Sequence, residues 1–169
     1  MKNLNLCEKI IKASFNFSVW FIERFYDMKS FKDKVEHLRN LPDDTLGYQI
    51  AKSLDSQNLK LIPKYESHDL KHVVLDYKMT PLDEIRMQAF MLGNGNYTLP
   101  CFTILIFGVI LLPWKWNLFY NDFEKGKKTK KISGWTIEKY AEFKIENLKS
   151  IIQKEYTDSA KILLEITKF

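Results

Sequence analysis

Residue types that define many functional sites are scarce in this chain, whose 169 residues include 3 His, 2 Cys, 5 Pro and 6 Gly. The two cysteines, Cys7 and Cys101, stand far apart and form no C-x-x-C pair, so the sequence does not support a thiolate zinc site. We expect no disulfide between them and interpret both as buried free thiols in a reducing compartment.

The sequence also lacks strand-like alternation, internal repeats and flexible linkers. The GNGN stretch at 93–96 follows a predicted helix instead of opening one, so it is not a phosphate-binding loop. Helical periodicity is present over Lys9–Tyr26 and from Thr136 onwards. We therefore predict a single all-α domain over residues 1–169, with about six or seven helices.

Charge of one sign is not dominant either. The net charge is +5, and much of it comes from the run EKGKKTKK at 124–131. We therefore do not interpret the whole chain as nucleic-acid binding. The basic run is interpreted as a solvated face, with an anionic membrane surface as the alternative. The N-terminus contains acidic residues and no small-residue cleavage site, so we expect neither a signal peptide nor a transit peptide.

Helix start signals occur in two segments. In LPDDTLGYQIAKSLDSQN, Asp43 or Asp44 is predicted to cap a helix with an apolar face at Leu46, Ile50 and Leu54.

In MTPLDEIRMQAFMLGNGN, Thr80 is the predicted N-cap and Pro81 the first helical residue. Gly93 and Gly95 mark the end of this helix.

An apolar run from Pro100 to Trp114 spans 15 residues. This is short of the roughly 20 that a membrane-spanning helix needs. Three interpretations remain open: a buried core helix, a helix that faces a lipid or dips into the membrane interface, and a true span. Phe102, Phe107 and Trp114 are the candidate contacts for a lipid or substrate.

Polar residues of ligand type gather in ESHDLKHVVLDYKMTPLDE. On a helix, side chains four residues apart lie on one face, so His68 and His72 can reach one metal ion. Asp69 lies about 100° round from His68, where it can bind at the edge of the site or hold an imidazole. Glu84 begins the next helix, and a helix hairpin would bring its carboxylate to the same ion. Asp76, four residues beyond His72, is a further candidate, either as a ligand or as a hydrogen-bond acceptor that holds one.

Two imidazoles with one or two carboxylates suit zinc, or a redox metal such as iron(II), better than magnesium or calcium. A zinc peptidase of the H-E-x-x-H type fits less well, because Asp69 is one methylene shorter than the glutamate that such enzymes use as a base. A histidine-aspartate phosphohydrolase needs further histidine ligands, and the remaining histidine is His37.

One motif matches a known family. It consists of His68-Asp69-x-x-His72, followed after eleven residues by Glu84, and it resembles the signature of the coenzyme Q biosynthesis protein four family. The chain resembles that family on both sides of the signature, over roughly residues 40 to 155. The matching segments are LPDDTLGYQIAKSLD, HVVLDYKMTPLDEIRMQAF, GNYTLPCFTILIFG and the basic run FEKGKKTKKI. The chain differs from the family at Asp76, where members commonly have Gly.

The resemblance implies an all-helical, peripheral membrane protein of ubiquinone synthesis that holds a prenylated quinone precursor. It implies a divalent metal, usually proposed to be zinc, bound by His68, Asp69, His72 and Glu84. It also implies partner biosynthetic enzymes, a homodimer and an oxidative decarboxylation at ring carbon 1 of the precursor. The Lys-, Asn- and Ile-rich composition indicates a bacterial protein acting in the cytoplasm, where the lipid can be another prenylated compound.

Three functions therefore compete. The first is a metal-dependent enzyme acting on a prenylated aromatic acid, with His68, Asp69, His72 and Glu84 as ligands and catalytic residues. The second is a lipid-binding scaffold that presents a quinone precursor to partner enzymes and uses a structural metal. The third is a hydrolase that activates a metal-bound water.

Overall fold

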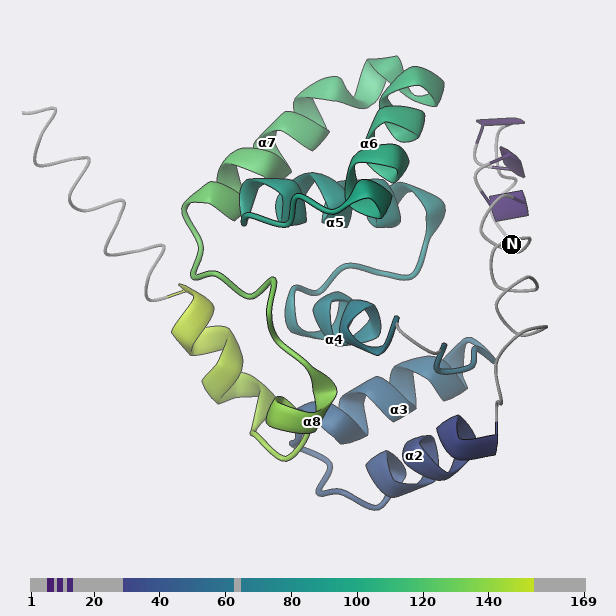
Figure 1. The fold of residues 1–169 in the computed structure, drawn as a ribbon, viewed down its shortest axis with the longest axis vertical. Coiled ribbons are helices and arrows are strands. Elements are labelled where there is room, and N and C mark those ends of the chain that lie inside the picture. The colour runs from purple at the N-terminus through teal and green to yellow at the C-terminus, as the bar shows by residue number, and fades with distance from the viewer. Residues whose placement is uncertain (1–5, 8, 11, 14–28, 63–64, 154–169) are drawn as a thin grey trace, which may run out of the picture. The chain divides into compact units, whose positions relative to one another are not determined.

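The structure is a computed structural model that describes residues 6, 7, 9, 10, 12, 13, 29–62 and 65–153 (Figure 1). Seven α-helices and one 3₁₀ helix have both ends within these residues. They are α2 (Lys29–Arg39), α3 (Leu46–Ser56), α4 (Glu66–Val74), α5 (Pro81–Gly93), α6 (Leu99–Leu111), η1 (Pro113–Lys115), α7 (Trp116–Lys127) and α8 (Ile137–Tyr140).

The prediction of an all-α fold is confirmed, since the described residues contain no strand beyond an isolated bridge between Thr45 and Lys144. Residues 145–153 are also helical. Most of the predicted helix Lys9–Tyr26, and the predicted helical tail beyond residue 153, lie outside the described residues.

The chain divides into two compact units, each made of two separate stretches. One comprises Met1–Pro81 and Trp135–Ile145, with α2, α3, α4 and α8. The other comprises Leu82–Gly134 and Glu146–Phe169, with α6, η1, α7 and nearly all of α5. One domain over residues 1–169 stays a prediction.

In the first unit, α3 supplies the core. Its predicted apolar face is confirmed, because Leu46, Ile50 and Leu54 are all buried. The predicted cap was wrong. Thr45, not Asp43 or Asp44, is the N-cap, and its hydroxyl accepts a hydrogen bond from the Tyr48 backbone N–H at 3.4 Å.

The first turn of α3 also pairs with the segment that follows α8. The backbone N–H of Leu46 donates to the Phe143 carbonyl at 2.9 Å, and that of Gly47 donates to the Ala141 carbonyl at 2.8 Å. The first N–H groups of a helix have no partner within the helix itself. Residues distant in sequence therefore complete the start of α3.

Three helices end in the same kind of turn, which depends on one residue with a positive φ. That residue is Asn58 after α3 (φ 53°), Asp76 after α4 (φ 58°) and Gly95 after α5 (φ 94°). In each case the next residue donates its N–H to the carbonyl five residues before it, which is the Schellman pattern. Left-handed backbone favours glycine, and Asn and Asp are the side chains that tolerate it best.

In the second unit, α5 is buried along most of its length and crosses α7 at a pair of glycines. A Cβ added to Gly93 would lie 2.0 Å from the Phe123 carbonyl oxygen, and one added to Gly126 would lie 2.0 Å from the Phe90 carbonyl oxygen. The two backbones are therefore in direct contact. Gly93 was predicted as the helix end, but Gly126 lies in the basic run interpreted as a solvated face, and it is buried.

The segment after α7 is held by the buried side chain of Asn94. Its amide nitrogen donates to the carbonyls of Gly126, Thr129 and Lys130 at 3.0–3.2 Å. Its amide oxygen accepts the N–H of Ile132 at 2.8 Å. One side chain thus fixes the basic run as it leaves the helix.

Helix α6 buries only Cys101 and Gly108. The Cys101 thiol lies 3.4 Å from the Gln88 carbonyl, and Gly108 lies against the Ile85 side chain, so this edge packs on α5. The opposite face is exposed and apolar except for Thr103. It consists of Leu99, Phe102, Thr103, Ile106, Phe107 and Ile110, at helical spacing.

The core-helix interpretation of the apolar run was therefore wrong. Periodicity could not reveal this, because α6 is apolar on both faces. Among the described residues, no single helix is long and apolar enough to cross a membrane; α6 and the segment Pro113–Lys127, bent from it by 108°, satisfy those criteria only as a pair.

Candidate metal centre

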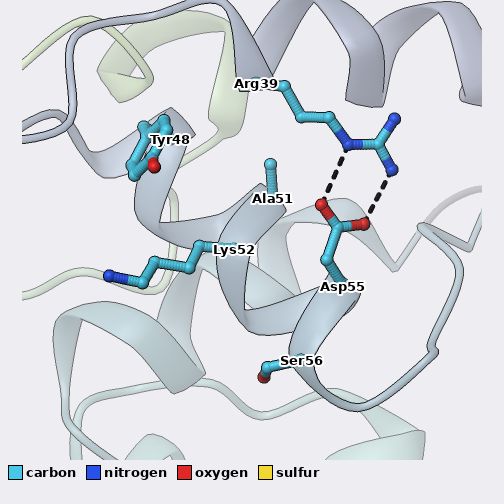
Figure 2. Close-up of a pocket in the computed structure, with 6 residues that line it drawn as sticks. All are labelled: Arg39, Tyr48, Ala51, Lys52, Asp55 and Ser56. Carbon is cyan, nitrogen blue, oxygen red and sulfur yellow. Dashed lines mark hydrogen bonds and ion pairs between the residues drawn. The ribbon is translucent and has the colours of Figure 1, made fainter.

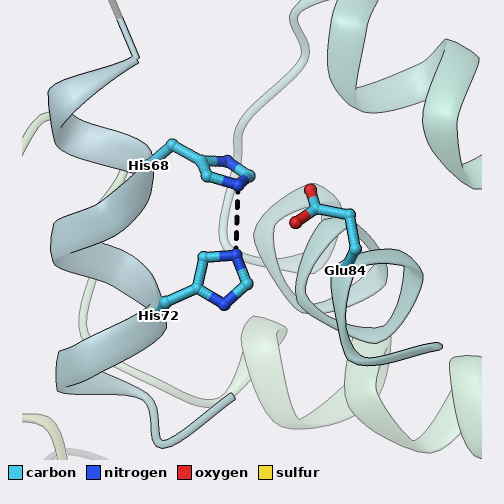
Figure 3. Close-up of side chains that lie close together, drawn as sticks. All are labelled: His68, His72 and Glu84. Carbon is cyan, nitrogen blue, oxygen red and sulfur yellow. Dashed lines mark hydrogen bonds between the residues drawn. The ribbon is translucent and has the colours of Figure 1, made fainter. Parts of the chain in front are cut away.

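The two histidines of α4 lie side by side, as their four-residue spacing predicts (Figure 3). Their Nε2 atoms are 3.1 Å apart and their ring centroids 4.7 Å apart. His72 is buried and His68 half-buried. Two imidazole ligands of a tetrahedral zinc ion, each about 2.0–2.1 Å from the metal, are themselves about 3.3 Å apart. The separation of the two nitrogens therefore suits a pair of ligands to one cation.

The other ring nitrogen of His72 has a partner at the end of α4. Nδ1 lies 3.1 Å from the backbone carbonyl oxygen of Tyr77. A carbonyl can only accept a hydrogen bond, so Nδ1 must carry the proton. In the neutral imidazole, Nε2 is then the nitrogen with the lone pair, which is the form that binds a metal.

Glu84 lies in the first turn of α5 and is buried, with 6% of its surface exposed. Its Oε1 accepts a hydrogen bond of 2.9 Å from Nε2 of Gln88, four residues further along the helix. A carboxylate in a first turn is also favoured by the helix dipole. Gln88 was not identified from the sequence, although the four-residue spacing on the predicted helix was a signal that could have revealed it.

His68, His72 and Glu84 each offer one ligand atom, and these atoms lie within 4.8 Å of one another (Figure 3). Two imidazole nitrogens and a carboxylate oxygen form a donor set found in zinc and non-haem iron sites. This group could hold a divalent metal ion, and its donor set does not distinguish between those two metals.

Two further candidates from the sequence are not members of this group. Asp69 is half-buried on α4, and its predicted place at the edge of the site stays a prediction. Asp76 was predicted to continue the histidine face by another helical turn. That prediction was wrong, because α4 ends at Val74 and Asp76 is the exposed left-handed residue that terminates it.

The candidate lipid contacts all have exposed surface. Phe102 and Phe107 belong to the exposed face of α6, and Trp114 in η1 is 63% exposed. Trp116 and Tyr120, four residues apart on α7, are also exposed. Sequence reasoning named the helix correctly as apolar, but it did not identify these last two aromatic residues as exposed.

A shallow hollow on the first unit has a different character (Figure 2). It is lined by Arg39, Tyr48, Ala51, Lys52, Asp55 and Ser56. Arg39 binds both carboxylate oxygens of Asp55, at 2.9 and 2.7 Å, and this hydrogen bonding holds the pKa of Asp55 below its usual value. Arg39 and Asp55 already satisfy each other at the surface, so this ion pair does not itself indicate a ligand.

No protein-family model matches the sequence, and no curated protein matches it significantly.

Proposed function

We propose that this chain is a metal-dependent protein of quinone biosynthesis and a divergent member of the coenzyme Q biosynthesis protein four family. The observation that carries the proposal is the cluster of His68, His72 and Glu84, whose ligand atoms lie within 4.8 Å of one another. The residues of the family signature other than Asp69 are thus the residues with suitable geometry for a cation.

In this proposal, His68, His72 and Glu84 hold the cation, and zinc or iron(II) fits the donor set. The bound metal would supply positive charge for a substrate carboxylate or phenolate and for negative charge that develops on the ring. The Tyr77 carbonyl and the Gln88 amide orient the ligand side chains through hydrogen bonds to His72 and Glu84.

The reaction that we propose is an oxidative decarboxylation of a prenylated aromatic acid. A ring carboxylic acid, O₂, two electrons and two protons give the ring hydroxyl compound, CO₂ and water. O₂ and a two-electron reductant must be supplied from outside the chain. This stoichiometry determines what an assay must contain and what it must detect.

The exposed face of α6 supports the lipid part of the proposal. This face includes Phe102, Ile106 and Ile110, and Trp114 in η1 is exposed as well. An isoprenoid tail or the apolar layer of a membrane surface would bury these side chains, at about 25 cal/mol per Å² of apolar area. The lysines of the run 124–131 would favour anionic headgroups, by about 1 kcal/mol each close to the surface.

The same apolar face favours a second candidate function, a scaffold that binds a prenylated lipid and presents it to partner enzymes. In that case the metal is structural. The two functions differ in one measurable respect, because the enzyme releases CO₂ and the scaffold does not.

The test combines metal content, lipid content and turnover on the purified protein. We expect near-stoichiometric zinc or iron in the wild type and loss of metal in His68→Ala/His72→Ala. His37→Ala is the matched control, since His37 is the remaining histidine and is exposed on α2. Native mass spectrometry reports bound lipid.

For turnover, a prenylated 4-hydroxybenzoate labelled in its carboxyl carbon is supplied with O₂ and a reductant, and released CO₂ is counted. Labelled CO₂ from wild type and His37→Ala but not from the double variant supports the enzyme. Metal and lipid without CO₂ under zinc or iron loading would support the scaffold. Absence of metal from every preparation would overturn both.

A further inference from the structure

The turn that ends α4 is joined to His72 at two points. The backbone N–H of Tyr77 donates to the His72 carbonyl at 3.1 Å, which is the hydrogen bond that closes the Schellman turn. The Tyr77 carbonyl in turn accepts from Nδ1 of the His72 ring, also at 3.1 Å. The backbone N–H and the backbone carbonyl of Tyr77 therefore both form hydrogen bonds with His72.

This arrangement depends on the backbone of Asp76. Its φ of 58° reverses the chain after the helix and places Tyr77 back over the last turn. Without the left-handed residue, Tyr77 would continue away from the helix and its carbonyl would not meet the ring. Asp tolerates this conformation, whereas β-branched residues do not.

Burial protects the hydrogen bond between His72 Nδ1 and the Tyr77 carbonyl from water. His72 and Tyr77 are 3% and 8% exposed, so the ring has little access to water that could replace the carbonyl as a partner. A buried ring nitrogen bound to a carbonyl must keep its proton there. The lone pair of the neutral ring is then confined to Nε2, the atom that lies 3.1 Å from Nε2 of His68.

We propose that Asp76 and Tyr77 are positioning residues for the metal centre: the left-handed turn at Asp76 places the Tyr77 carbonyl on Nδ1 of His72, which fixes the ring in the Nδ1–H tautomer with Nε2 directed at the cation. The inference deepens the proposed function and rests on it for its metal-binding consequence. The terminator of α4 thus serves two purposes, since it ends the helix and sets the protonation pattern of a ligand.

The α3 terminator provides a matched control within the same chain. Asn58 has nearly the same φ, 53°, and Leu59 closes the same hydrogen bond back to Leu54. No histidine is bound there: the residue in the place of His72 is the buried, apolar Leu54. A β-branched residue at Asn58 therefore imposes similar backbone strain without disturbing an imidazole.

The first experiment reads the tautomer directly in metal-free protein. Two-bond ¹H–¹⁵N correlation spectra, recorded at a pH where the rings are neutral, distinguish a protonated ring nitrogen from one with a lone pair. We expect His72 to be protonated at Nδ1. Protonation at Nε2 would overturn the proposal whether or not the protein binds metal. An Nδ1–H ring in a protein that never binds metal would instead overturn the proposed function and leave the positioning role intact.

The second experiment measures Zn²⁺ affinity by competition with a chromophoric chelator. Asp76→Gly keeps the turn, and we expect its affinity to stay within about twofold of the wild type. Asp76→Val should bind about tenfold more weakly, the lower end of the range for lost support of a metal ligand. Tyr77→Phe keeps the carbonyl and should bind like the wild type. Asn58→Val should lower the melting temperature to a similar extent as Asp76→Val without changing the affinity.

If Asp76→Val does not fold, Asp76→Ala gives a milder strain at the same position, and its spectrum is read for a mixture of His72 tautomers. Equal loss of Zn²⁺ affinity in the Asp76 and Asn58 variants would overturn the proposal, because the effect would then be one of general stability. Unchanged affinity and tautomer in a folded Asp76→Val would overturn it as well.

Discussion

Gly93 and Gly126 occupy reciprocal positions where α5 crosses α7. Each glycine lies against a backbone carbonyl of the opposite helix, and that carbonyl belongs to the residue three positions before the other glycine. Gly93 meets the Phe123 carbonyl, and Gly126 meets the Phe90 carbonyl. A methyl group at either position would lie at 2.0 Å from backbone, which cannot move as a side chain can. The crossing therefore admits glycine alone.

Alanine at either glycine should destabilise the second unit. We expect Gly126→Ala to lower the free energy of unfolding by about 3 kcal/mol, at the upper end of the cost of overpacking, since the helices must separate. Urea denaturation followed by circular dichroism measures this. Gly134→Ala is the control, because a Cβ at Gly134 would meet nothing within 4 Å. Equal stability of the Gly126 and Gly134 variants would refute the crossing.

Replacement of Asn94 should be costly for a different reason. Asn94→Ala removes a donor shared by three carbonyls and an acceptor for one N–H. We expect a loss of about 2–3 kcal/mol, because buried groups remain without partners. Asn121→Ala on the exposed side of α7 should change the stability little. Chemical denaturation of the two variants gives the comparison, and similar midpoints would contradict the assigned role.

Removal of the Glu84 charge should weaken the metal centre more than removal of the Asp69 charge. Glu84→Gln keeps the shape of the side chain but replaces an anionic ligand, and we expect Zn²⁺ affinity to fall at least about tenfold. Asp69→Asn should have the smaller effect, because its carboxylate is not one of the clustered ligand atoms. Isothermal titration calorimetry with Zn²⁺ provides both values. The reverse order would make Asp69 the carboxylate ligand.

Polar substitution on the exposed face of α6 should reduce lipid binding without unfolding the protein. Ile106 and Ile110 are 57% and 71% exposed, so Ile106→Asn/Ile110→Asn removes little buried area. We expect about tenfold weaker binding to vesicles containing phosphatidylglycerol, from the lost apolar contact of two side chains. Leu59→Asn makes the same kind of change at an exposed residue of the first unit and should bind normally. Cosedimentation measures each, and equal binding by all three proteins would remove the evidence for this face.

The site could be predicted from the sequence to the extent that it is local. His68 and His72 are four residues apart on one helix, and Glu84 opens the next helix, so periodicity was sufficient to group them. The end of α4 could not be predicted in this way. Asp76 lies four residues beyond His72 and was interpreted as a candidate ligand or as a hydrogen-bond acceptor for one, whereas its φ of 58° makes it the residue that ends the helix.

Misassigned elements elsewhere depend on neighbours that are remote in sequence. Gly126 was grouped with the surrounding lysines, and only its contact with Phe90 explains why it is glycine. The exposure of α6 was equally hidden, because a helix that is apolar all round has no pattern to indicate which face is covered. Thr45 was passed over for two aspartates, although all three residues are good N-caps.

The pairing of α3 with residues 141–143 has a consequence for protein synthesis. The carbonyls of Ala141 and Phe143 that complete the start of α3 leave the ribosome nearly a hundred residues after Leu46 and Gly47, which need them. The stretch Leu82–Gly134 emerges in between. A nascent chain that stops short of Ala141 thus holds an incomplete first unit, and a nonsense mutation late in the gene would damage the fold near its beginning.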